Sequence, residues 1–210
     1  MDVHAPHEPI HTWRDFFIHL ITITVGLLIA LSLEGMVESI HKHHLLHQAE
    51  TNLRAELKSN RSTLAGDERQ LDSAKRQAES NLQLLAALKA HHPSGEELHF
   101  NWQWNGLDEA AWDTARNTGA IALMPYASAQ GYSLFYAQQR MVGDQATVYI
   151  RGIYRSSAPL QNGRKLADLR PDELDAIAAS QQQTLVDLNY LQDLCASLDR
   201  IYSRAKQEME

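Results

Sequence analysis

An apolar run of 18 residues, residues 16–33, is the strongest pattern in the first part of the chain. It carries no formal charge and has an acidic residue on either side. As a helix it would span about 27 Å, at about 1.5 Å per residue, close to the roughly 30 Å hydrocarbon layer of a bilayer. The pattern therefore predicts a transmembrane helix over residues 16–37, if the helix tilts, after a flexible N-terminal tail over residues 1–15.

Two other interpretations of this run remain open. A cleaved signal peptide is one, because Ala30-Leu31-Ser32 offers small residues at a suitable spacing. The region before the run is acidic, however, whereas a signal peptide begins with a basic region. The other interpretation is a buried core helix of a soluble protein. A transmembrane helix explains the length of the run and its charged boundaries together.

One face of the predicted helix is small and polar, while the other faces carry Phe, Ile, Leu and Val. Its members follow one another at spacings of three or four, so they lie on one side of a helix. Close approach of two helices in a membrane favours small residues at the contact, although such residues are also common in membrane spans by chance. The face predicted to pack against another helix consists of His19, Thr22, Gly26, Ala30 and Leu33.

An apolar residue recurs at every seventh position after the run. Residues 38–64 contain neither proline nor glycine, so the helix is expected to continue out of the membrane. A narrow apolar stripe suits packing in a helical bundle. A free-standing coiled coil is disfavoured because the companion positions Asn60, Asp67 and Asn81 are polar. The repeat consists of Leu57, Leu64, Leu71, Ala78 and Leu85.

Proline and glycine indicate where the helices begin and end. Pro93 and Gly95 end the first helix, Gly119 follows a short second helix, and Pro125 is tolerated in the first turn of a third. We predict an all-α fold, in which one N-terminal transmembrane helix continues into an up-and-down bundle of four or five helices over residues 38–210. The later helices are expected over residues 107–119, 124–157 and from Pro171 to near the end.

Charge and composition exclude some functions. The net charge is −7, and the part of the chain from Glu34 onward keeps a net charge of −5. An acidic domain with scattered Lys and Arg is a poor binder of polyanions, so nucleic acid is not an expected partner. The single cysteine, Cys195, excludes an intrachain disulfide. It has no neighbouring histidine and falls on the apolar side of the last helix, so we expect it in the core.

Motifs of known enzymes are missing from the sequence. It contains no GxSxG, no HExxH, no CxxC and no glycine-rich phosphate loop. We therefore predict a non-enzymatic protein without a cofactor. The tryptophans Trp102, Trp104 and Trp112 are interpreted as core residues, with an aromatic belt at the membrane surface as the alternative.

Histidine is concentrated in the first half of the chain, where all eleven residues lie before position 100. Four of them fall in "HKHHLLH", just beyond the apolar run, at helical spacings of three and four. Each such pair could chelate a divalent metal through neutral imidazoles. A polar collar on an exposed helix and a pH-responsive patch are the alternatives. The candidate ligands are His41, His43, His44 and His47.

Several stretches carry a resemblance to a known family. They are "VGLLIAL" at 25–31 with an acidic residue soon after, "AETNLRAELKSN" at 49–60, "AAWDTARNTGAIALMP" at 110–125 and "YSLFYAQQ" at 132–139. Together they resemble a family of uncharacterised bacterial single-pass membrane proteins. The resemblance implies a short cytoplasmic N-terminus, one span in the bacterial inner membrane and a periplasmic helical domain. The acidic N-terminus differs from the basic one that is frequent in such proteins.

These patterns lead to a functional hypothesis. We expect a scaffold or accessory subunit of a membrane protein complex, with the lipid bilayer and other membrane subunits, or a second copy of the chain, as its partners. The alternative hypothesis is a membrane-tethered metal or pH sensor that uses the histidines of residues 41–47.

Overall fold

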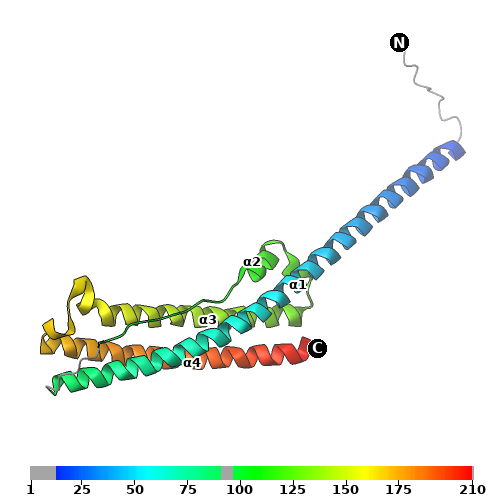
Figure 1. Ribbon diagram of the computed structural model, residues 1–210. Helices are drawn as coiled ribbons and strands as arrows, with labels where there is room; N and C mark the ends of the chain where they lie inside the picture. The colour runs from blue at the N-terminus through cyan, green and yellow to red at the C-terminus, as the bar shows by residue number, and fades with distance from the viewer. Residues whose placement is uncertain (1–12, 91–96, 210) are drawn as a thin grey trace, which may run out of the picture. The chain divides into compact units, whose positions relative to one another are not determined.

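The computed structural model describes residues 13–90 and 97–209, with side chains up to residue 203. Most of the predicted tail, including three of its histidines, and the predicted stop signals Pro93 and Gly95 lie outside the described residues. Helices and connecting segments, without a β-strand, make up the part that is described (Figure 1). This confirms the all-α prediction. The described residues form the α-helices α1 (Trp13–Lys89), α2 (Ala110–Asn117), α3 (Tyr126–Ser157) and α4 (Pro171–Met209).

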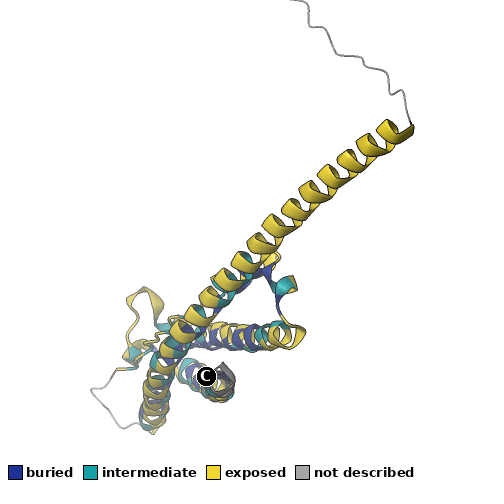
Figure 2. Ribbon diagram, turned by 90° about the vertical axis from the view of Figure 1, so that its right-hand side faces the viewer, coloured by how far each residue is buried: buried dark blue, intermediate teal, exposed yellow. Residues whose placement is uncertain are grey.

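The chain divides into two compact units, residues 1–48 and residues 49–210, and the second is called the helical domain below. In the first unit every side chain from residue 13 to residue 44 is exposed (Figure 2). The apolar run lies in this part of α1, and its most apolar window has a mean hydropathy of 2.4. By length and composition this is the one helix in the described part that could cross a membrane.

Polar contacts between side chains show that α4 runs antiparallel to α1 in the helical domain. The amide of Gln192 donates to a carboxylate oxygen of Asp72 at 2.7 Å, and the ammonium of Lys75 donates to the amide oxygen of Asn189 at 2.7 Å. As the residue number rises on α1, it falls on α4. The connection between α3 and α4 likewise reverses the chain (Figure 1).

The helices α1 and α3, in contrast, run parallel to each other. The hydroxyl of Tyr136 donates to Glu56 at 2.6 Å, and the amide of Asn60 donates to the side-chain oxygen of Gln139 at 3.1 Å. Here the residue numbers rise together on both helices. The predicted up-and-down order is therefore wrong for the step from α1 to α3.

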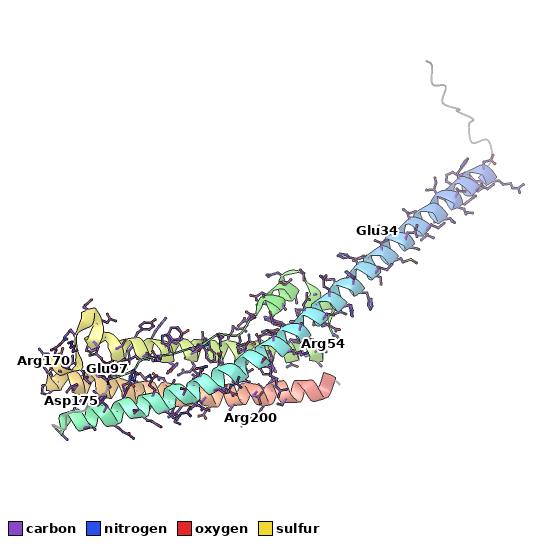
Figure 3. The ribbon with its side chains drawn as sticks, in the orientation of Figure 1. Glu34, Arg54, Glu97, Arg170, Asp175 and Arg200 are labelled. Atoms are coloured by element: carbon purple, nitrogen blue, oxygen red, sulfur yellow. The ribbon has the colours of Figure 1, made fainter. Side chains whose placement is uncertain are left out.

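An extended segment, residues 97–109, makes the parallel order possible. It carries the chain back along the helical domain, so α3 starts at the same end as the domain's part of α1 (Figure 1). Glu97 lies near Arg170 and Asp175, at the end of the domain where α4 begins (Figure 3). Lys89, the last residue of α1, forms an ion pair with Asp175 at this same end. The chain thus returns along the bundle as an extended segment, whereas an up-and-down bundle returns as a helix.

The apolar repeat on α1 forms the centre of the domain, as predicted. Leucines 53, 57, 64, 71 and 85 are buried, and so are Ile177, Leu188, Leu191 and Leu198 on α4. Aromatic rings fill the end nearest α2, where Trp112 stacks on Tyr136 with ring centroids 5.1 Å apart. Cys195 is fully buried, which confirms its predicted core position.

The ends of the helices follow the predicted signals closely. Gly119 adopts a φ of 78° after α2, a conformation that glycine reaches without steric strain. Pro125 is the N-cap of α3 and not part of its first turn, and α4 begins at Pro171. Gly152 allows α3 and α4 to approach closely, because a Cβ there would lie 2.7 Å from the hydroxyl oxygen of Thr184.

Candidate functional site

Three polar side chains are buried along α1, at positions where a bundle normally has apolar residues. Asn60, Asp67 and Asn81 are at most 3% exposed. A buried polar group is costly unless it forms hydrogen bonds. All three side chains form them with the extended segment.

The two asparagines bind the backbone of the segment in the same way. The amide of Asn60 donates to the carbonyl of Asp108 at 2.7 Å and accepts from the N–H of Asp108 at 2.9 Å. Asn81 repeats this with His99, donating at 2.6 Å and accepting at 3.0 Å. Each amide side chain therefore satisfies both backbone groups of one residue, as a neighbouring strand would.

Asp67 binds the segment between these two points. Its Oδ1 accepts from the backbone N–H of Asn105 at 3.1 Å and from the side-chain amide of Asn105 at 2.6 Å. Its Oδ2 is buried and has no hydrogen-bond partner among the described residues. The three pairs Asn60–Asp108, Asp67–Asn105 and Asn81–His99 are called the polar ladder below.

The spacing of the polar ladder follows from the geometry of a helix beside an extended chain. Seven helical residues rise about 10.5 Å, and three extended residues span about 10 Å, so seven positions on α1 match three on the segment. The observed pairs obey this ratio over the whole ladder, with the two chains running in opposite directions. The same ratio places Ala74 opposite Trp102. The side chain of Ala74 is a methyl group, which cannot form a hydrogen bond with the segment.

A groove lies at this position on the surface of the helical domain. Its volume is about 300 Å³, and it is called the Ala74 groove below. None of its lining side chains carries a formal charge. Trp102 is 39% exposed, and its ring meets Tyr154 edge-on with centroids 6.3 Å apart. The lining residues are Gln70, Ser73, Ala74, Gln77, Asn101, Trp102 and Gln103.

A carboxylate joins three elements at the other end of the segment. Glu56 accepts a hydrogen bond from the Tyr136 hydroxyl and another, at 2.7 Å, from the backbone N–H of Ala111 in the first turn of α2. An acidic group is favourable at the N-terminus of a helix. Burial, and then the hydrogen bond to Glu56, raise the pKa of Tyr136 far above its usual range. The Tyr136 phenol therefore stays protonated, and this cluster holds α2 in place.

The predicted histidine ligands lie on the exposed part of α1. His43, His44 and His47 border one shallow surface region together with Ser39 and Ile40. In residues 13–90 and 97–203, no three or more His, Cys, Asp or Glu side chains form a group that could hold a metal ion. Metal binding at His41, His43, His44 and His47 stays a prediction.

The predicted helix-packing face also lies on the exposed part of α1. A Cβ added at Gly26 would meet no atom within 4 Å, so this position offers an open surface. The hydroxyls of Thr22 and Thr24 each donate to the carbonyl four residues before, at 2.8 Å. These bonds satisfy the polar groups within the helix itself, which an apolar environment requires. Packing through His19, Thr22, Gly26, Ala30 and Leu33 stays a prediction.

The three tryptophans of the helical domain have different environments. Trp112 is buried, as the core interpretation predicted. Trp104 is partly exposed, and Trp102 is exposed in the Ala74 groove. The core interpretation is therefore right for Trp112 and wrong for Trp102.

Sequence reasoning missed the polar ladder, although its signal was present. Asn60, Asp67 and Asn81 share one position of the seven-residue repeat, where polar residues disfavour a coiled coil. A polar residue that recurs in this way at a core position indicates a chain that runs alongside the helix and needs hydrogen bonds. The partner residues in the segment could not be found, because its register depends on the tertiary structure.

Comparison with known proteins adds no relative. No protein-family model matches the chain, and no curated protein or solved structure matches it significantly.

Proposed function

We propose that the chain is a non-enzymatic, single-pass protein of the bacterial inner membrane. Its helical domain acts on the periplasmic side as a scaffold or accessory subunit of a membrane protein complex. The membrane helix covers residues 16–37 and contacts a partner helix through its small, polar face. The bacterial source and the periplasmic side rest on the family resemblance.

The observation that carries this proposal is the complete exposure of the apolar run. Its most apolar 18-residue window has no side chain buried inside the structure. Soluble proteins rarely expose continuous apolar patches larger than a few hundred Å². A helix that is apolar on all sides needs lipid or another protein around it. This argues against the alternative of a core helix in a soluble protein.

The helical domain supports a structural role. Its buried polar groups on α1 bind the extended segment, and Glu56 holds α2. The buried thiol of Cys195 has a pKa raised to about 12 by burial and then by nearby carboxylates, so it is a poor nucleophile at neutral pH. The hydrogen-bonding residues thus fix the shape of a surface, which is the task of a scaffold.

Thr22 and Thr24 offer a closely matched test of the contact through the membrane helix. Both threonines are exposed, and both hydroxyls make the same internal hydrogen bond. Two residues apart, they are separated by about 160° around the helix, and only Thr22 lies on the small face. The full chain with Thr22→Leu or Thr24→Leu would be purified in a mild detergent, and the proteins that copurify identified by mass spectrometry.

The proposal expects a membrane protein to copurify with the wild type and with Thr24→Leu, and to be lost with Thr22→Leu. Gly26→Leu, on the same face, should have the same effect as Thr22→Leu. Self-association would appear as a change in the size of the detergent complex. A wild-type chain that is monomeric and has no partner would overturn the proposal. Equal partner loss in both threonine variants would show that the small face is not the contact.

A further inference from the structure

We propose that the Ala74 groove binds a primary carboxamide, the group at the end of asparagine and glutamine side chains. The residues involved all belong to the helical domain, and the inference does not depend on a membrane location. It starts from the register of the polar ladder, in which one position lacks its polar side chain.

The ladder defines what a ligand at this position must offer. Asn60 and Asn81 each satisfy the N–H and the carbonyl of one extended residue with a single amide. Ala74 has no such group, and in the described part of the chain the backbone of Trp102 forms no hydrogen bond with another backbone group. A ligand that pairs with both backbone groups needs an acceptor and a donor side by side. A primary carboxamide has this arrangement.

The lining of the groove favours a neutral group at the position opposite Ala74. Three glutamines, one asparagine and one serine line the site. None of the lining side chains carries a charge that could neutralise a charged group on a ligand. A carboxylate or an ammonium group would lose part of its hydration there without a charged partner. A carboxamide has no such penalty and can form further hydrogen bonds with the glutamine side chains.

Trp102 and the volume of the groove indicate what precedes the amide group. The exposed indole offers a flat apolar surface to the methylene groups of an asparagine or glutamine side chain. The groove, at about 300 Å³, is larger than an amide group alone requires. It matches the lower end of the sizes of small-molecule sites. The ligand can therefore be free glutamine or asparagine, or the side chain of one of these residues in a peptide.

Saturation-transfer NMR on the full chain in detergent micelles would test this site, since it detects weak ligands on large particles. The probes are L-glutamine and the blocked peptide acetyl-Ala-Gln-Ala-N-methylamide. In the comparison ligands, glutamine is replaced by glutamate, or by a glutamine whose side-chain amide nitrogen has two methyl groups. Both keep the stem that contacts Trp102 but lose the paired donor and acceptor.

Two substitutions provide matched variants. Ala74→Asn supplies the missing amide from α1 itself and should occupy the position of the ligand's amide group. Ala65→Asn makes the same change at an exposed position of the same helix, outside the groove. L-Glutamine should bind to Ala65→Asn as tightly as to the wild type. It should bind at least about tenfold more weakly to Ala74→Asn, because the two hydrogen bonds to the backbone of Trp102 are no longer available to the ligand. Trp102→Ala should also weaken binding.

Each outcome bears on the proposal. Binding of either glutamine probe, with loss in Ala74→Asn, supports it; binding of the peptide alone would identify a partner chain as the source of the amide. Equal binding of the glutamate or dimethylated probe would overturn the assignment of a carboxamide. No binding of any probe, or unchanged binding in Ala74→Asn, would also overturn it. A lower melting temperature for Ala74→Asn than for Ala65→Asn would show that residues 74 and 102 are not in register.

Discussion

Replacing Asn60 with leucine is the most direct test of the polar ladder. Leucine has nearly the same size and shape, so the change removes hydrogen bonds without opening a large cavity. Three bonds are lost: two to the backbone of Asp108, and one to the side-chain oxygen of Gln139. The carbonyl of Asp108 keeps a second donor, the amide of Gln139 at 2.8 Å.

The expected loss of stability can be worked out from these bonds. A net contribution of about 1 kcal/mol for each bond gives a loss of about 3 kcal/mol in the free energy of unfolding. For a chain of this size, 1 kcal/mol corresponds to about 2–4 °C in melting temperature. The Asn60→Leu variant should therefore melt roughly 6–12 °C below the wild type.

The control for this test is Asn52→Leu in the same helix. Asn52 is exposed, so its replacement should change stability by no more than about 0.5 kcal/mol. Any gain in helix propensity from asparagine to leucine is present in both variants and cancels. The assay is thermal unfolding of the full chain in a nonionic detergent, followed by circular dichroism. Equal melting temperatures for the two variants would refute the conclusion that the ladder stabilises the domain.

Three further predictions follow from individual contacts. Cys195, buried and with a pKa of about 12, should resist alkylation by iodoacetamide in the folded chain and react after unfolding in urea; labelling of the native chain would contradict its burial. Glu173 has its pKa lowered from 4.5 to about 2 by an arginine side chain and a backbone N–H. Because the folded value is the lower one, its stabilising effect is present above about pH 4.5 and is lost as the pH falls through 2. Glu173→Gln should therefore lower the melting temperature at neutral pH, and equal differences from wild type at neutral pH and at pH 2 would contradict this. Gly152→Ala should destabilise the domain by about 1–3 kcal/mol in urea titrations, because its Cβ would overlap a threonine on α4, whereas Gly131→Ala, in an open position on α3, should be neutral or stabilising. Similar effects at the two glycines would show that α3 and α4 do not approach closely.

The helical segments and their apolar faces can be predicted from the residue pattern alone. The breaks at Gly119, Pro125 and Pro171 are local backbone effects, so they could be placed to within a few residues. The seven-residue repeat identified the buried leucines of α1, because the period of a helix fixes which positions share a face. The apolar run was equally clear, since charge is excluded from it over its whole length.

The direction of α3 and the path of the extended segment depend on long-range contacts that local patterns do not predict. A segment without regular periodicity gives no signal for its register, and the parallel order of α1 and α3 depends on that segment. The same reason explains why the Ala74 groove could not be predicted. Ala74 belongs to an ordinary helical stripe and Trp102 to an irregular stretch, and nothing local connects them. They come together because seven helical residues and three extended residues have almost the same length.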